Sequence, residues 1–138
     1  MTKGRGAPQL KRGLKQKKGH RARVEGRRSE WVAAFWLLAK GWRILGFRYR
    51  TPQAEIDLVA RKGAVLILVE VKHRRTLAEA VSAVSPDQLA RLRRAGDGIA
   101  ARLMAKHARA KSLVVRLDLI ALAPKRLPRH IEDAWPDL

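Results

Sequence analysis

Apolar side chains occur in blocks along the chain, and two regions carry the start and stop signals of helices. Residues 31–39 are all apolar, Ser29 before them is a favourable N-cap, and Gly41 after them favours a helix end. These signals predict a first helix between Ser29 and Gly41. At residues 85–88 the sequence Ser-Pro-Asp-Gln combines an N-cap, a proline at the first helical position and an acid in the first turn. It predicts a second helix that ends at about Lys106.

The other apolar blocks have the patterns of β-strands. Residues 54–61 largely alternate between apolar and polar side chains, whereas residues 64–69 are apolar throughout, as in a strand covered on both faces. We therefore expect residues 64–69 to form the central strand. The remaining expected segments are strands at Trp42–Arg50 and Leu113–Leu122, a turn at Lys62-Gly63 and a short C-terminal piece at Ile131–Trp135. This order, without internal repeats, predicts an α/β fold.

Charge changes this picture, because 31 Lys and Arg against 12 Asp and Glu give a net charge of +19. Residues 1–28 alone hold 11 of the basic residues and one acid, with too few apolar side chains to offset the entropy of ordering. We expect residues 1–28 to form a flexible basic arm and residues 29–138 to form one domain. Such a protein is expected to bind a polyanion, and phosphate is the obvious one. A solvated basic surface is the alternative.

The amino-acid composition excludes several other classes of protein and of functional site. The chain has no cysteine, which excludes disulfides and a cysteine nucleophile and fits a reducing compartment. Its longest apolar runs are too short to span a bilayer, which needs about 20 residues, and the N-terminus lacks the apolar stretch of a secretory signal. We therefore expect a cytoplasmic protein with no membrane partner.

Two carboxylates and a lysine stand at positions where charge needs an explanation. Side chains alternate along a strand, so Glu70 and Lys72 should project from one face. If residues 54–61 pair with residues 64–72, Asp57 comes from the adjacent strand and can approach Glu70. The pair could then share a hard divalent cation such as Mg²⁺, with Lys72 orienting water or stabilising phosphate charge. A plain Glu70–Lys72 ion pair is the alternative.

The same segments carry a family resemblance. Ala-Glu-Ile-Asp-Leu-Val-Ala at residues 54–60 and Val-Glu-Val-Lys-His-Arg at residues 69–74 resemble the signature G-E-I-D-L-I-A … V-E-V-K-x-R of the bacterial YraN-like family. Further landmarks follow in order, at Ser29-Glu30, Leu38–Leu45, Gln88 and Ile131–Trp135. Ala54 and Ser29 stand where that family has glycine, and the basic arm is longer than usual. The family looks like a branch of the PD-(D/E)XK nuclease superfamily.

This resemblance implies a restriction-endonuclease-like core, which is a mixed central sheet flanked by helices, and an endonuclease that uses Mg²⁺ or Mn²⁺. It implies that Asp57, Glu70 and Lys72 are the metal and catalytic residues, with Glu30 as a further metal ligand. Gln88 matches a helix glutamine of the superfamily that helps position the site, although helix capping explains it equally well. DNA, including branched or processed intermediates, is favoured over RNA as the substrate, and junction-cleaving relatives imply a homodimer that presents two sites.

Basic residues near these motifs are the expected contacts to nucleic-acid backbone, namely Arg48, Arg50, Arg74, Arg75, Arg91 and Arg94. Trp31, Phe35 and Trp36 are interpreted as core residues of the first helix rather than as stacking platforms. The main alternative to a nuclease is a non-catalytic DNA- or RNA-binding protein with the same fold and arm. A ribonucleoprotein component would explain the arm alone.

Overall fold

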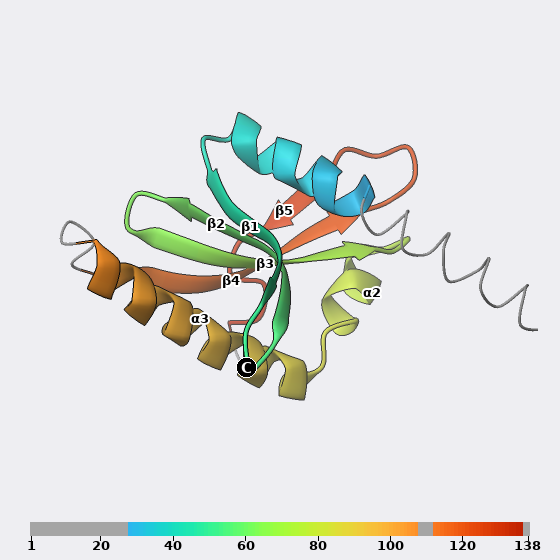
Figure 1. Ribbon diagram of the computed structural model, residues 1–138. Helices are drawn as coiled ribbons and strands as arrows, with labels where there is room; N and C mark the ends of the chain where they lie inside the picture. The colour runs from blue at the N-terminus through green and yellow to red at the C-terminus, as the bar shows by residue number, and fades with distance from the viewer. Residues whose placement is uncertain (1–27, 108–111, 137–138) are drawn as a thin grey trace, which may run out of the picture.

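A computed structural model describes residues 28–107 and 112–136 of the chain. Residues 28–39 are helical, and they are followed by β1 (Arg43–Arg50), β2 (Glu55–Lys62), β3 (Val65–His73), α2 (Leu77–Ser82), α3 (Pro86–Lys106), β4 (Val114–Leu122) and β5 (Arg129–Ile131). All five strands form one sheet (Figure 1). The predicted α/β fold is confirmed, whereas the predicted arm lies almost wholly outside the described residues.

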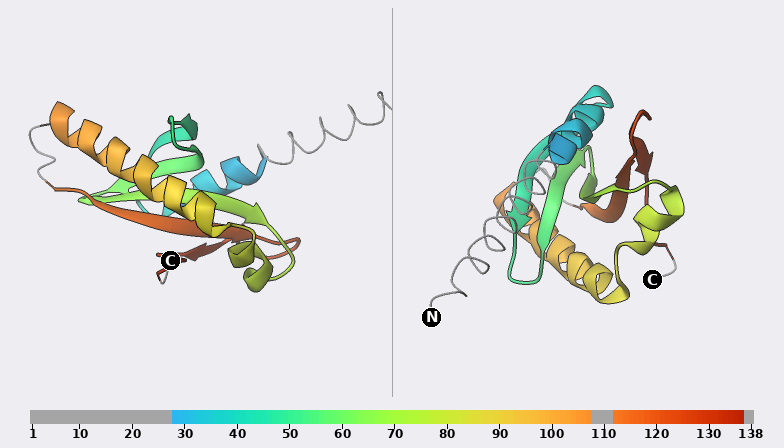
Figure 2. Two further views of the ribbon diagram at one scale, coloured as in Figure 1. Left: turned by 90° about the horizontal axis from the view of Figure 1, so that it is seen from below. Right: turned by 90° about the vertical axis from the view of Figure 1, so that its right-hand side faces the viewer.

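The strands lie in the sheet in sequence order, β1-β2-β3-β4-β5, so β3 is central as predicted. Antiparallel pairs join β1 to β2, β2 to β3 and β4 to β5, while β3 and β4 are parallel and are connected through α2 and α3. The sheet is therefore mixed. The carboxyl ends of β3 and β4 meet at one edge, where α2 also lies (Figure 2), and such an edge is where open α/β sheets place their ligand sites.

Alternating residues of β3 divide the core into two layers. Leu66 and Leu68 pack with the apolar side of α3, whereas Ile67 and Val69 pack beneath the helix of residues 28–39. Figures 1 and 2 show the two helices on opposite sides of the sheet. Because both faces are covered, an uninterrupted apolar strand is stable in the middle of this sheet.

Several local predictions need correction. The helix of residues 28–39 already includes Ser29, so this residue does not cap it. The β2–β3 turn lies at residues 63–64, one position later than predicted. Helix α2 was not predicted, although Thr76 caps it by accepting the backbone N–H of Glu79, as the Thr-x-x-Glu pattern would have indicated.

The aromatic side chains of the first helix are the largest departure from the expected core. Trp31 is 57% exposed and Phe35 is 65% exposed, so their interpretation as core residues was wrong; Trp36 is half-buried. The helix contacts the sheet instead through Ala33, Ala34 and Leu37. Uniformly apolar sequence cannot show which side of a helix is buried, because its periodicity is lost.

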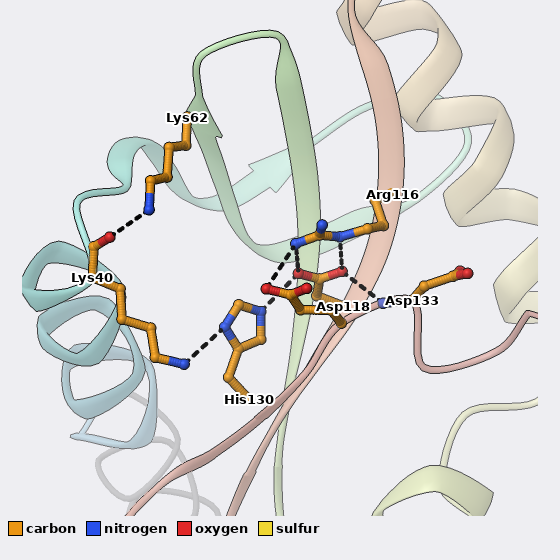
Figure 3. Close-up of polar contacts among 7 residues, drawn as sticks. Lys40, Lys62, Arg116, Asp118, His130 and Asp133 are labelled. Atoms are coloured by element: carbon orange, nitrogen blue, oxygen red, sulfur yellow. Dashed lines mark hydrogen bonds and ion pairs between the residues drawn. The ribbon is translucent and has the colours of Figure 1, made fainter.

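A network of polar side chains joins β5 to β4 (Figure 3). Asp118 is fully buried. Its carboxylate accepts two hydrogen bonds from Arg116 and one from the backbone N–H of Asp133. His130 Nε2 lies 2.7 Å from the same carboxylate. Every carboxylate oxygen of Asp118 is thus paired, which is what a charge at this depth requires.

Within residues 28–107 and 112–136, no helix combines the length and the apolar character needed to cross a membrane.

Candidate functional site

The candidate site lies where β2 separates from the end of β3. The last paired residues of these strands are Leu58 and Val69. Just beyond them, the Asp57 carboxylate accepts the backbone N–H of Val71 at 2.8 Å. This hydrogen bond holds Asp57 against the residues on both sides of Val71, which are Glu70 and Lys72.

Glu70 is the most unusual group of the site, because it is a carboxyl that is only 3% exposed. Its Oε2 lies 3.4 Å from the side-chain amide of Gln88, whereas Oε1 is buried with no hydrogen-bond partner. Burial, with the neighbouring Asp57 charge, raises the pKa of Glu70 to about 8, against the opposing effect of Lys72. A buried carboxyl with a free oxygen is costly unless a proton or a cation compensates.

Asp57 and Lys72 complete the group that the sequence singled out. Burial raises the pKa of Asp57, while the Val71 hydrogen bond and the Lys72 charge act in the opposite direction. Lys72 lines the same cavity as Asp57, and its charge acts to lower the pKa of both carboxyls. The structure thus brings Asp57, Glu70 and Lys72 together as expected.

Glu30 is close to this group but has a partner of its own. Its carboxylate accepts the Arg48 Nε–H at 3.1 and 3.2 Å, in a partly buried ion pair between the first helix and β1. Burial raises the pKa of Glu30, and the nearby Asp57 charge adds to the rise while Arg48 opposes it. Glu30 therefore faces the site, but its strongest contact is with Arg48.

The Gln88 side chain contacts Glu70 and does not complete a capping box with Ser85. The backbone N–H of Gln88 donates to Ser85 Oγ at 3.2 Å, which caps α3. Its side chain does not return to Ser85 as a full capping box requires, but reaches Glu70.

A cavity of about 860 Å³ opens beside Asp57 at the carboxyl ends of β3 and β4. Glu70 is not among its lining residues, which are Arg28, Ser29, Glu30, Val32, Asp57, Val71, Lys72, His73, Arg74, Leu122, Ala123, Arg126 and Pro128. Four of these residues are Lys or Arg and two are acids, so the cavity presents cations around a small acidic centre. That combination suits a phosphate ester that meets a metal ion.

The six arginines expected to contact nucleic acid are spread over the surface. Arg74 lines the cavity, and Arg50, Arg75, Arg91 and Arg94 are exposed elsewhere. Arg48 differs, because its guanidinium is engaged by Glu30.

Two cavity arginines escaped the sequence analysis. Arg28 had been assigned to the arm, and Arg126 lies in the segment after β4, for which the sequence predicted no helix or strand. A parallel pairing of β3 with β4 would have indicated Arg126, because the segments that follow two parallel neighbours leave the sheet at the same edge.

The donor set fits a divalent ion only in part. Among the described residues, no group of three or more His, Cys, Asp or Glu side chains has the arrangement of a complete metal site. Mg²⁺, however, commonly takes one or two protein carboxylates and completes its shell with water and substrate phosphate. Asp57 and Glu70 are the two carboxyls that could meet this smaller requirement.

Comparison with known proteins places the chain in a family. Residues 29–122 match the uncharacterised protein family UPF0102, to which this chain belongs. A UPF0102 protein of Caulobacter vibrioides is 56% identical over 123 residues, covering 89% of this chain and 95% of the relative. A UPF0102 protein of Maricaulis maris is 44% identical over 114 residues, covering 83% and 87%. The inferred membership of the YraN-like family is confirmed.

Proposed function

We propose that this protein is a metal-dependent nuclease that hydrolyses phosphodiester bonds of nucleic acid, with DNA as the favoured substrate. One observation supports this most strongly: Glu70 is buried against the carboxyl of Asp57, and its Oε1 accepts no hydrogen bond from an N–H donor. A protein that only binds phosphate gains nothing from two carboxylates beside it, since they repel the ligand.

Asp57 and Glu70 are the residues that would hold Mg²⁺ or Mn²⁺. When bound, such an ion activates water and neutralises charge on the phosphate. Lys72, whose charge acts on both carboxyls, would orient the attacking water or stabilise negative charge on the phosphate oxygens. Gln88 positions Glu70 through their side-chain contact.

The remaining cations of the cavity suit the backbone of a polynucleotide. Arg28, Arg74 and Arg126 surround the acidic centre and come from three separate segments of the chain. Phosphates on either side of the scissile bond can contact them, which would fix the register of the strand without reading its sequence.

The test incubates wild type with labelled single-stranded, duplex, flap and four-way-junction DNA and the matching RNA, in Mg²⁺, Mn²⁺ or EDTA. We expect cleavage that EDTA, Asp57→Asn, Glu70→Gln and Lys72→Met each abolish while binding is retained. Asp97→Asn is the control, because Asp97 is an exposed acid of α3 that does not line the cavity. Binding of the panel without metal-dependent cleavage would replace the nuclease by a nucleic-acid-binding protein.

A further inference from the structure

Three aromatic side chains lie together on the surface, and none of them lines the cavity beside Asp57. Trp31 and Phe35 of the first helix are 57% and 65% exposed, and Phe47 of β1 is 39% exposed. The Trp31 ring centroid lies 5.0 Å from that of Phe47 and 6.2 Å from that of Phe35. We call these three residues the aromatic surface. They border an apolar groove of about 280 Å³ whose other lining residues include Leu38, Arg43 and Ile44.

The exposure of these rings has no explanation in the packing of the domain. The helix already contacts the sheet through Ala33, Ala34 and Leu37, and Leu58 and Ala60 lie in the same apolar cluster. Within residues 28–107 and 112–136, nothing covers the opposite side of the helix. A contiguous apolar patch of this kind on a small domain marks an interaction site.

Charge indicates which partner fits. The chain carries +19, and 11 of its basic residues lie within residues 1–28, directly before Trp31. Arg43 lines the groove itself, and Arg50 is exposed on the same strand, β1. A second copy of the chain would bring a second charge of +19 to this surface. A single-stranded polynucleotide instead brings phosphates for the arginines and flat apolar bases for the rings.

We propose that the aromatic surface stacks the unpaired bases of a nucleic-acid strand, and that the substrate class is therefore single-stranded or locally unpaired. This inference rests on the proposed function for its biological sense, since it extends the same substrate beyond the cavity. The first helix joins the two regions, because Arg28, Glu30 and Val32 line the cavity while Trp31 and Phe35 line the groove. Bases in an intact duplex are already stacked and cannot offer their faces to Trp31.

The experiment measures binding in EDTA, so that cleavage plays no part. Fluorescence anisotropy compares labelled oligothymidylate, oligouridylate and a DNA duplex with wild type, Trp31→Ala and Phe35→Ala. We expect each substitution to weaken single-strand binding by about 5- to 30-fold and duplex binding much less. The dependence of affinity on salt should stay unchanged, because neither residue carries charge. Trp31→Phe should retain most of the affinity.

The matched control is Val114→Ala, which truncates an exposed apolar residue (62%) at the start of β4, outside the groove. Single-strand affinities of Trp31→Ala and Phe35→Ala equal to that of Val114→Ala would overturn the inference. Analytical sedimentation gives a second way to overturn it. If wild type is a dimer, and Trp31→Ala is a monomer that binds single strands as tightly as wild type, the aromatic surface joins two copies of the chain instead. A separate cleavage assay in Mg²⁺ tests the proposed nuclease activity. If wild type does not cleave nucleic acid but the two substitutions still weaken single-strand binding, the nuclease proposal is wrong and the base-binding surface stands.

Discussion

The side-chain amide of Gln88 lies 3.4 Å from Glu70 Oε2, and this contact ties the first turn of α3 to the end of the central strand. Ser85 caps this helix by accepting the backbone N–H of the same residue. The position of the helix start and the position of the buried carboxyl are thus set together. The other oxygen of Glu70 has no such partner. Because this carboxyl is buried, the stability of the protein should depend on pH.

Glu70→Gln should stabilise the protein at alkaline pH in EDTA. The pKa of Glu70 is about 8 in the folded protein and about 4.5 in an unfolded chain. Between these values the folded state binds more protons, so the stability of wild type falls as pH rises through this window. Each pKa unit corresponds to about 1.4 kcal/mol, so the variant should gain on the order of 2–4 kcal/mol above pH 8.

Thermal denaturation from pH 4.5 to 9 measures this difference. The advantage of Glu70→Gln over wild type should grow with pH and vanish near pH 4.5, where both side chains are neutral. A constant offset across the range would show that the carboxyl is not held protonated by burial.

Glu30 and Asp57 should differ in their effect on metal binding. Because Arg48 occupies the Glu30 carboxylate, we expect Glu30→Gln to keep most of the thermal stabilisation that Mn²⁺ gives wild type at pH 8. Asp57→Asn should lose it. Titration of the melting temperature with Mn²⁺ tests both variants, and equal losses would make Glu30 a full ligand, as the family resemblance implied.

Asp118→Asn should destabilise the protein by about 2–4 kcal/mol at pH 7, because it removes the charge that pairs with Arg116 and His130. Burial would raise the pKa of Asp118, but its hydrogen bonds to His130, Arg116 and the Asp133 backbone outweigh burial and hold that pKa below 3.8. The stabilisation is therefore present above pH 3.8 and is lost as pH falls through the lower folded value.

Urea denaturation at pH 7 and at pH 3 checks this expectation, and the gap between Asp118→Asn and wild type should be smaller at pH 3. Glu132→Gln is the control, because Glu132 is exposed and makes only a 3.6 Å contact with Arg116. It should change the free energy of unfolding by less than about 0.5 kcal/mol. Equal effects of the two substitutions would contradict a structural role for the buried network.

Gly96→Ala and Gly98→Ala should change the free energy of unfolding in opposite directions, although both residues lie in α3. A Cβ at Gly96 would stand 2.6 Å from Val115 Cγ1 and 3.3 Å from Leu68, so Val115 or the helix would have to shift. A Cβ at Gly98 meets nothing within 4 Å. We expect Gly96→Ala to lower the free energy of unfolding by about 1–3 kcal/mol and Gly98→Ala to raise it by about 0.5–1 kcal/mol.

Chemical denaturation measures both variants. Similar effects at the two positions would mean that α3 does not pack against β3 and β4 at Gly96.

The sequence alone determined those features of the fold and of the candidate site that depend on residues close together in the chain. Ser85-Pro86 starts α3, the apolar run before Glu70 forms the central strand, and alternation places Glu70 and Lys72 on one side of it. These features depend on neighbours in sequence, whose geometry a strand or a helix fixes by its own repeat. The same repeat explains why Asp57, Glu70 and Lys72 could be identified as a group.

Only the tertiary structure decided the features that depend on distant contacts. Arg48 pairs with Glu30, Arg126 joins the cavity because β4 lies parallel to β3, and Trp31 stays exposed because the helix turns its alanines to the sheet. His130 of β5 reaches the buried carboxylate of Asp118 in the same way. None of these contacts leaves a local signal, because burial and pairing are properties of the packed elements and not of any one segment.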